Sequence, residues 1–181
     1  MKETAISTER VFEGRLLKID VVSVALDDGT RASREIVRHP GAAVILCRKP
    51  DGMFIFVRQY RLAARSALLE AVAGTLEPGE DPSDCARREV EEETGYRPLR
   101  MVPLGQAFPA PGYTEELFHF FYAELSATAG KQATDDDERV DVVELSRDGF
   151  EAMIAHGDIR DAKTLAVWLL FSHCFPNPVI A

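Results

Sequence analysis

Four glutamates fall within five consecutive positions of the chain, at Glu89, Glu91, Glu92 and Glu93. Residues three and four apart share one face of an α-helix, so a helix here points Glu89, Glu92 and Glu93 in the same direction. Like charges at this spacing destabilise an isolated helix by roughly 0.2–0.5 kcal/mol per pair, and the negative end of the helix dipole disfavours them further. Because hard divalent cations bind carboxylate oxygens, a bound metal would reverse the sign of this cost.

A solvated acidic surface is the competing interpretation, since charge runs are usually solvated and Arg87 and Arg88 partly neutralise this one. The residues before the run favour the metal site. Gly74 opens a loop that ends at Glu80, and the expected helix follows directly. Read as one unit, the segment is Gly74, five residues, Glu80, seven residues, Arg88-Glu89-Val90, one residue, Glu92-Glu93, one residue and Gly95-Tyr96.

One helix must position these carboxylates. We expect it to begin at Pro82, which suits the first helical position, with Asp81 as the N-cap. Gly95 is a good residue for ending the helix in a left-handed conformation. The glutamates then lie in the last turns of a helix whose two ends are both encoded locally.

Strands are expected on both sides of this helix. Apolar and β-branched segments bounded by turn residues predict them at residues 11–17, 19–26, 31–37, 42–47, 54–60, 103–108, 116–124 and 140–144. Residues 42–47 are continuously apolar, so this strand should be buried on both faces. Two more helices are expected at residues 147–156 and 161–174. The second is expected to bury the stripe formed by Leu165, Trp168, Leu169 and Ser172.

These elements predict an α+β fold, an α/β/α sandwich in which helices flank a mixed central sheet. The first three strands form a separate small antiparallel sheet, so we divide the chain into an N-terminal β-sheet region at residues 1–40 and a second domain at residues 41–181. The small sheet has little around it to bury its apolar face. A second copy of the chain would supply that cover, and we therefore expect a homodimer that forms through residues 1–40.

Composition limits the class of protein. A chain of 181 residues with 46% hydrophobic and 28% charged residues is typical of a globular protein. The net charge of −9 repels phosphates, so we expect no nucleic-acid partner, although cations would let the chain hold a small phosphate compound. The three cysteines are too far apart to suggest a disulfide framework or a zinc site. Without an apolar run of membrane-spanning length or a signal-peptide pattern, we expect a cytoplasmic protein and no membrane partner.

The segment from Gly74 to Tyr96 resembles the Nudix box, GX5EX7REUXEEXGU, in which U is a bulky apolar residue. Every fixed position of the box is filled. Tyr96 stands at the final U, a packing position that is usually aliphatic. The resemblance implies a Nudix fold for residues 41–181 and metal-dependent hydrolysis of a diphosphate inside a nucleoside-diphosphate compound.

The resemblance also implies a role for each residue of the box. Glu92 is a candidate for acid/base help as well as for metal binding, and Arg88 would orient the glutamates. The metal would be Mg²⁺, with Mn²⁺ as the alternative, bridging and neutralising the diphosphate and activating a water. The implied metal ligands are the side chains of Glu80, Glu89, Glu92 and Glu93 and the backbone carbonyl of Ala73.

The resemblance extends to the ADP-ribose pyrophosphatase branch of the family. Residues 35–42, 57–61, 69–74 and 109–116 match its pattern, and a branch-specific proline is matched by Pro111. The branch implies hydrolysis of ADP-ribose to AMP and ribose 5-phosphate, and dimers that exchange N-terminal strands. The implied substrate contacts are Arg58 and Arg61 for the diphosphate, Glu70 for a ribose hydroxyl or metal, and Pro111.

Two points of the pattern leave alternatives open. The branch usually has proline where Val72 stands, which would leave the backbone near Ala73 looser. The catalytic base in this branch is often a glutamate on a late loop, and in this chain Glu138 is the first candidate and Asp137 the second. A plain solvated loop explains the same acidic residues.

Other functions are compatible with the box. Selectivity for base and sugar depends on the shape of the pocket, so another nucleoside-diphosphate sugar or a dinucleotide is the alternative substrate. A non-catalytic module that senses a nucleotide ranks lower, because such modules usually lose box glutamates and this box is complete.

Overall fold

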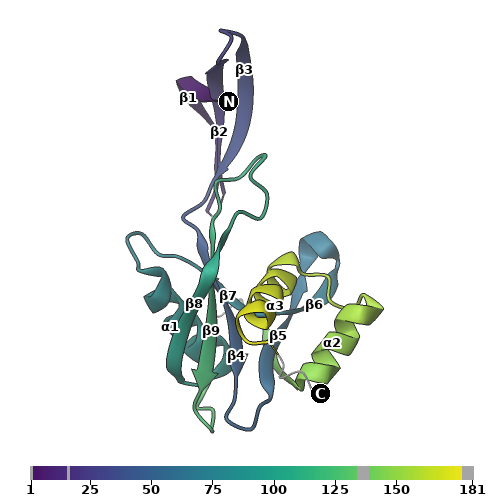
Figure 1. Ribbon diagram of the computed structural model, residues 1–181. Coiled ribbons are helices and arrows are strands. Elements are labelled where there is room, and N and C mark those ends of the chain that lie inside the picture. Colours follow the sequence, from purple (N-terminus) through teal and green to yellow (C-terminus); the bar gives the residue numbers. More distant parts are fainter. Residues whose placement is uncertain (1, 16, 134–138, 177–181) are drawn as a thin grey trace. The chain divides into compact units, whose positions relative to one another are not determined.

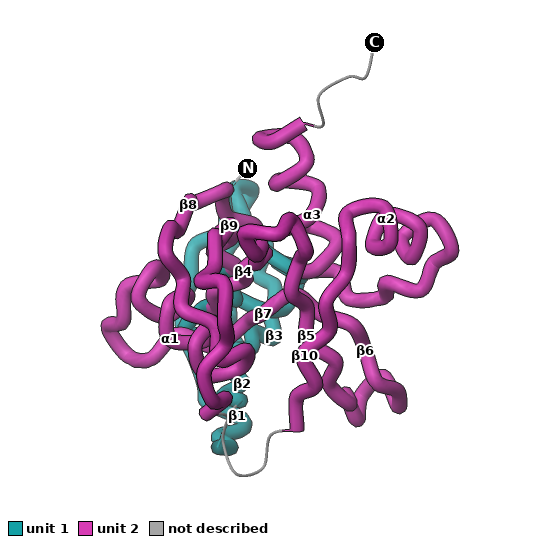
Figure 2. Tube along the Cα trace, turned by 90° about the horizontal axis from the view of Figure 1, so that it is seen from below, with its two compact units in different colours: residues 1–41, 108–117 teal, residues 42–107, 118–181 magenta. Residues whose placement is uncertain are grey.

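The computed structural model describes residues 2–15, 17–133 and 139–176. The chain forms two compact units, which Figure 2 distinguishes by colour. The first is Met1–Gly41 with Phe108–Leu117, and the second is Ala42–Ala107 with Phe118–Ala181. The first unit ends close to the boundary expected after residue 40, but it also includes Phe108–Leu117, which was not expected from the sequence. That segment belongs there because Val37 donates to the carbonyl of Tyr113 at 2.8 Å.

The first unit contains an antiparallel sheet with the strand order β1-β2-β3. Its strands are β1 (Glu3–Glu13), β2 (Lys18–Leu26) and β3 (Arg31–Arg38). The expected strand at residues 11–17 is wrong in position. The chain turns after Glu13, where Gly14 donates to the carbonyl of Leu17 at 2.8 Å. The start of β1 was predicted too late in the chain. All of β1 is exposed and much of it is polar, so no alternation of apolar residues marks where the strand begins.

The second unit contains a mixed sheet with the order β10-β5-β4-β9-β8, while β6 pairs with β5 and β7 with β4. Strands β4 and β9 run parallel, and the other pairs are antiparallel. The strands are β4 (Ala42–Arg48), β5 (Phe54–Arg61), β6 (Ser66–Glu70), β7 (Val72–Thr75), β8 (Pro98–Ala107), β9 (Phe118–Leu125) and β10 (Val140–Leu145). A 3₁₀ turn, η1 (Leu62–Ala64), connects β5 to β6. Strands β6 and β7 were not predicted from the sequence, because they are short and separated by a single residue.

Helices cover both faces of this sheet, as Figure 1 shows. They are α1 (Pro82–Thr94), α2 (Arg147–His156) and α3 (Ala162–Cys174). Side chains of α1 pack with Ile45 and Cys47, while α2 and α3 pack with Val44 and Leu46. Alternate residues of β4 therefore serve two cores, which confirms the α/β/α sandwich and the strand buried on both faces. Among the described residues, no helix is long and apolar enough to cross a membrane.

The rotation of α3 differs from the prediction. Its buried residues are Thr164, Val167, Trp168 and Phe171. Leu169 is 70% exposed and Leu165 is 37% exposed, so the predicted stripe is wrong for these two residues, while Trp168 is buried as expected. Thr164 anchors the helix, since its hydroxyl donates to Asp161 at 2.5 Å and accepts from the backbone N–H of Ala71 at 2.7 Å. This buried hydrogen-bond pair turns Trp168 onto Phe54 and leaves Leu169 outward.

The ends of α1 lie where the sequence predicts them. The side chain of Asp81 accepts from Ser83 N at 2.8 Å, and Pro82 begins the helix. Gly95 ends it with a φ of 72°, and its N–H donates to the carbonyl of Glu91 at 2.9 Å. A Cβ at Gly95 would lie 2.7 Å from the carbonyl oxygen of Gly130. Both the left-handed backbone and a packed neighbour therefore require glycine.

Substituting Gly95 tests this double requirement against a matched helix end. Gly157, which ends α2, also has a left-handed φ of 80°, but a Cβ there would meet nothing within 4 Å. We expect Gly157→Ala to destabilise the protein by about 1 kcal/mol and Gly95→Ala by about 2 kcal/mol or more, because only the latter adds a clash. Urea unfolding measures both, and equal losses would contradict the clash with Gly130.

Candidate active site

Gly74 lies at the end of β7, where α1 crosses the sheet. A Cβ built on Gly74 would lie 1.8 Å from the carboxyl carbon of Glu89. The carboxylate of Glu89 thus occupies the volume that any side chain at position 74 would fill. A side chain at the first glycine of the box would therefore displace the carboxylate of Glu89 from the strand backbone.

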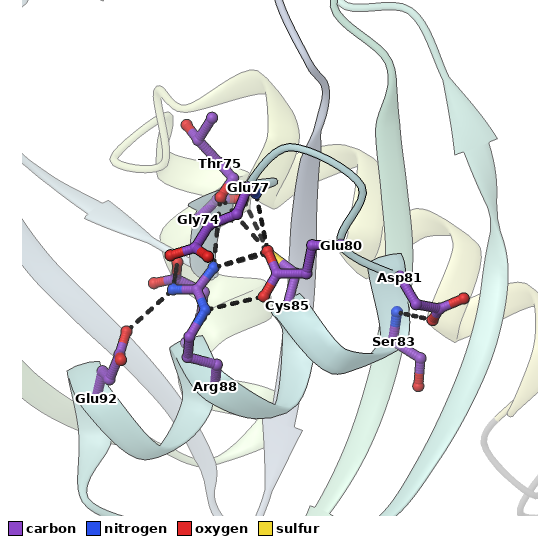
Figure 3. Close-up of polar contacts among 10 residues, drawn as sticks. Gly74, Thr75, Glu77, Glu80, Asp81, Ser83, Cys85, Arg88 and Glu92 are labelled. Atoms are coloured by element: carbon purple, nitrogen blue, oxygen red, sulfur yellow. Dashed lines mark hydrogen bonds and ion pairs between the residues drawn. The ribbon is translucent and has the colours of Figure 1, made fainter.

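Arg88 lies among three carboxylates, as Figure 3 shows. Its Nε and Nη2 each donate to the carboxylate of Glu80 at 3.0 Å. Its Nη1 donates to Glu89 at 2.6 Å and to Glu92 at 3.1 Å. One guanidinium therefore joins the loop before α1 to two glutamates of the helix, which is the geometry that an orienting residue needs.

The electrostatics of this cluster shift both partners. Arg88, helped by the N–H of Glu77 at 2.9 Å, lowers the pKa of Glu80 to about 2. The hydrogen bonds that Arg88 donates to Glu80 are in turn the largest cause of the raised pKa of Arg88. Below this cluster, burial raises the pKa of the Cys85 thiol to about 12, so Cys85 is a packing residue beneath the loop.

The box glutamates differ in exposure. Glu93 is 4% exposed and faces the sheet, where its charge contributes to the raised pKa of Cys47 and of Arg61. The side chain of Glu89 is 14% exposed, and that of Glu92 is 40% exposed. The three carboxylates of the helix thus differ in environment: Glu93 is buried against the sheet, Glu89 contacts Gly74, and Glu92 is exposed to solvent.

Glu70, at the end of β6, is a buried carboxylate with two cationic partners. It is 1% exposed. Arg61 donates to it through Nε at 2.8 Å and Nη2 at 2.7 Å, and Lys163 donates at 2.5 Å. Burial opposes ionisation, but the hydrogen bonds and charges of Arg61 and Lys163 outweigh it and lower the pKa of Glu70. Arg58, also a predicted substrate contact, is exposed on β5.

The backbone near Ala73 is held on both sides. Ala73 is paired with Val44 and Val72 with Ile45 in the β4–β7 ladder. Ala71 and Val72 are fully buried, and the N–H of Ala71 donates to Thr164. Strand pairing fixes this backbone, so valine in place of the usual proline at position 72 does not leave it loose.

Pro111 belongs to the first unit, where it lines a cavity of about 530 Å³. Arg38 ties this segment to the small sheet, because it donates to Asp20 and to Glu115, each at 2.7 Å. Other lining residues include Arg34, Arg38, Phe108 and Tyr113. The cavity therefore combines guanidinium groups with aromatic rings. Glu138 and Asp137, the candidate bases, lie outside the described residues.

Three residues of the Glu70 network were not found by sequence reasoning. Asp161, Lys163 and Thr164 were assigned only to the start of a helix. One signal was present in the sequence: Glu70 lies in an apolar run, and a buried carboxylate needs a cationic partner. Nothing in the spacing identifies a partner 93 positions away.

The donor set suits a hard divalent cation. Carboxylate oxygens and backbone carbonyls are the ligands that Mg²⁺ and Mn²⁺ accept, and the glycine at position 74 leaves room for the Glu89 carboxylate. Within the part of the chain that the structure describes, no three His, Cys, Asp or Glu side chains form a metal-ligand cluster. The guanidinium of Arg88 instead provides the positive charge among Glu80, Glu89 and Glu92.

Several known proteins are similar to this chain in sequence or in fold. The NUDIX domain family matches residues 37–166. An ADP-ribose pyrophosphatase of Bacillus subtilis (strain 168) is 36% identical over 165 residues, which cover 91% of this chain and 89% of that protein. A methanol dehydrogenase activator of Bacillus methanolicus is 39% identical over 165 residues, covering 91% and 89%. A GDP-mannose pyrophosphatase of Yersinia enterocolitica is 38% identical over 152 residues, covering 77% and 78%.

A crystal structure of an ADP compounds hydrolase has the same fold, with a TM-score of 0.81 over 96% of this chain and 94% of that chain at 22% identity. The family match covers well over half of the chain, so the protein belongs to the Nudix family. It is a hydrolase that acts on diphosphate bonds. Enzymes of this family generally need a divalent cation.

A methyl group at position 74 tests the contact between Gly74 and Glu89. We expect Gly74→Ala to lower turnover about 100-fold, because a displacement of roughly 1 Å in a reacting site has this effect. Titration with Mn²⁺, followed by electron paramagnetic resonance, should show weaker metal binding. Gly130→Ala is the matched control, since neither glycine has a positive φ and a Cβ at Gly130 would make only an ordinary contact of 3.5 Å. Unchanged metal binding in Gly74→Ala would argue against Glu89 as a ligand.

The low pKa of Glu80 predicts how stability depends on pH. A carboxylate whose folded pKa is lowered from 4.5 to about 2 stabilises the fold above pH 4.5, and this contribution disappears as the pH falls towards 2. Glu80→Gln should therefore lower Tm at pH 7 in EDTA, and the gap to the wild type should narrow below pH 4.5. Glu91→Gln, at an exposed position of the same helix, should show little effect. A gap that does not narrow with falling pH would contradict this linkage.

Proposed function

We propose that the protein hydrolyses ADP-ribose to AMP and ribose 5-phosphate with Mg²⁺ or Mn²⁺. The carrying observation is that a complete box, with Glu89 on Gly74 and Arg88 among the glutamates, stands in a chain 36% identical to an ADP-ribose pyrophosphatase over 91% of its length. The bound cations supply charge neutralisation of the diphosphate and a more acidic water.

The side chains divide the remaining work. In this proposal Glu80, Glu89, Glu92 and Glu93 and the carbonyl of Ala73 hold the cations. When no substrate is bound, the positive charge of Arg88 offsets the repulsion among the carboxylates and keeps them in place. Glu92, with its side chain 40% exposed, is the box residue best placed to exchange a proton with solvent. Glu138 is proposed as the general base that takes the proton of the attacking water.

Arg61 is proposed to bind the diphosphate, assisted by Arg58. Arg61 donates to Glu70 through Nε and Nη2, so its Nη1 remains outside that bidentate contact. The side chain of Arg61 is also 43% exposed. A guanidinium held on one edge and open on the other suits phosphate oxygens, which it contacts by its planar fork. Glu70 orders this arginine, and Pro111 is proposed as a further substrate contact.

The sequence of the first unit supports a homodimer that residues 1–40 form. Every residue of β1 is exposed, and Ile6, Val11 and Phe12 are each about half exposed. Strand β1 is also an edge of its sheet, with a row of backbone groups that a second chain can pair. Exposed apolar side chains on an exposed edge strand favour burial against a second copy of the chain. In this proposal, residues 41–181 form the hydrolase domain.

A second function is favoured by one relative. The methanol dehydrogenase activator is 39% identical to this chain. The chain could thus stimulate an alcohol dehydrogenase in addition to cutting a diphosphate. Adding the purified protein to a methanol dehydrogenase assay tests this, with Glu93→Gln as the comparison. Stimulation that Glu93→Gln abolishes would tie the activation to hydrolysis, and no stimulation by the wild type would remove this function.

A substrate panel tests the proposed hydrolysis. The protein is incubated with Mg²⁺ and ADP-ribose, GDP-mannose, ADP-glucose, NADH, diadenosine polyphosphates or nucleoside triphosphates, and the products are identified by chromatography. We expect ADP-ribose to give AMP fastest and EDTA to stop the reaction. Faster hydrolysis of another compound would retain the glutamate chemistry but change the substrate, and no hydrolysis of any would leave a nucleotide-sensing module.

Neutralising the box should separate chemistry from folding. Glu93→Gln is expected to lower kcat by about 100-fold or more, since it removes a proposed metal ligand while keeping the shape of the side chain. Glu91→Gln, which lies outside the fixed positions of the box, should keep wild-type turnover. Circular dichroism and Tm confirm that both variants fold. Retained activity in Glu93→Gln would mean that the proposed metal site is wrong.

Light scattering tests the dimer. We expect a mass of twice the 20.1 kDa of one chain. Phe12→Glu should shift the protein towards monomer, because it places a charge where apolar surface is proposed to be buried. Leu169→Glu, which adds the same charge to an exposed apolar residue of α3, should leave the mass unchanged. A wild-type mass of one chain, or dissociation only by Leu169→Glu, would contradict a dimer formed through β1.

A further inference from the structure

Lys163 lies in the first turn of α3 and contacts the carboxylate that holds Arg61. Its Nζ donates to Glu70 at 2.5 Å and to Asp161 at 3.0 Å. The side chain of Lys163 is 14% exposed and that of Glu70 is 1% exposed, whereas that of Arg61 is 43% exposed. The two cations on Glu70 therefore differ. Lys163 is enclosed by the fold, and Arg61 reaches solvent.

A second set of contacts fixes where Lys163 stands. Asp161 is the N-cap of α3 and accepts from the N–H of Thr164 at 3.0 Å. The hydroxyl of Thr164, 0% exposed, accepts from the N–H of Ala71 at 2.7 Å. Ala71 is the residue after Glu70, so the first turn of α3 holds both the side chain of Glu70 and the backbone that follows it. Lys163 is thereby placed by the helix start rather than by its own flexible stem.

The charges explain why one cation is not enough. A buried carboxylate without a cation is costly, so Glu70 must keep a partner at all times. If Arg61 were the sole partner, a phosphate that bound Arg61 would compete with Glu70 for the same guanidinium. Lys163 carries part of the Glu70 charge permanently. The positive charge of Arg61 is then available to an anion while its orientation is still set by the bidentate contact.

We propose that Lys163 is a positioning residue that, by sharing the Glu70 carboxylate, keeps Arg61 oriented and electrostatically available for the diphosphate of the substrate. This inference rests on the proposed function of the same site. Lys163 does not itself contact the substrate. Its effect passes from α3 through Glu70 to Arg61, and it acts on binding of the diphosphate in both the ground state and the transition state.

Kinetics of Lys163→Met test this role, because methionine keeps the apolar stem and removes the charge. An interaction made equally in ground state and transition state appears in KM, so we expect KM for ADP-ribose to rise about tenfold with kcat changed by less than about threefold. Lys163→Arg should restore most of the affinity. A variant with wild-type KM would overturn the proposal.

Lys49→Met is the matched control for a purely structural effect. Lys49 also joins two carboxylates, Glu144 at 2.8 Å and Asp51 at 3.0 Å, and its side chain is 12% exposed. Loss of this lysine should lower Tm to a similar degree without changing KM. An equal rise of KM in Lys49→Met would show that the effect of Lys163→Met reports general loosening, and it would overturn the proposal.

A double variant tests whether Lys163 acts on Arg61 through Glu70. In a Glu70→Gln background, where no buried charge is left to balance, Lys163→Met should change KM by less than about twofold, since the carboxylate through which it acts on Arg61 is already neutral. Two independent, multiplicative effects on KM would place the action of Lys163 elsewhere and overturn the proposal. Thermal unfolding of all variants establishes that each is folded at the assay temperature.

A binding measurement separates this inference from the proposed function. Calorimetry with inorganic pyrophosphate and Mg²⁺ measures diphosphate affinity without turnover, and Lys163→Met should weaken it about tenfold. If the wild type hydrolyses no substrate of the panel, the proposed function fails, and the pyrophosphate affinities still decide the role of Lys163. If the wild type is active and Lys163→Met binds pyrophosphate equally well, only the role of Lys163 is overturned.

Discussion

The concentration of negative charge in the last turns of α1 is the constraint on which the rest of the site depends. Glu89, Glu92 and Glu93 lie where the helix dipole and their mutual repulsion both oppose them. Arg88, from the same helix, contacts two of them and reaches back to Glu80. The residue that compensates the charge on the helix therefore also attaches the preceding loop to it. One guanidinium thus neutralises part of the charge on α1 and orders the loop before it.

The sheet brings backbone and helices together at β6 and β7. From one face, Glu89 of α1 packs on Gly74, which leaves no space for a side chain there. From the first turn of α3, Lys163 holds Glu70 and Thr164 holds the N–H of Ala71. These two short strands pair with β5 and β4, the centre of the buried core. Elements from both helical layers thus contact one stretch of backbone.

Local features of the sequence predicted much of this arrangement. The N-cap at Asp81, the end at Gly95 and the spacing of the box depend on residues within a few turns of one another, and the structure confirms the helix that they define. Features without a local pattern were missed or misplaced. Strand β1 is largely polar, and β6 and β7 are short. Leu169 was assigned to the core because apolar spacing does not report the rotation that Thr164 imposes on α3.

The sequence by itself determined the family and the carboxylate helix, because a helix of fixed period converts spacing directly into a shared face. Only the tertiary structure decided which distant groups complete the site. Glu70 and Lys163 are 93 positions apart, as are Ala71 and Thr164. Such pairs meet through strand pairing and through the rotation of a packed helix, and both of these depend on the whole core rather than on the residues that finally touch.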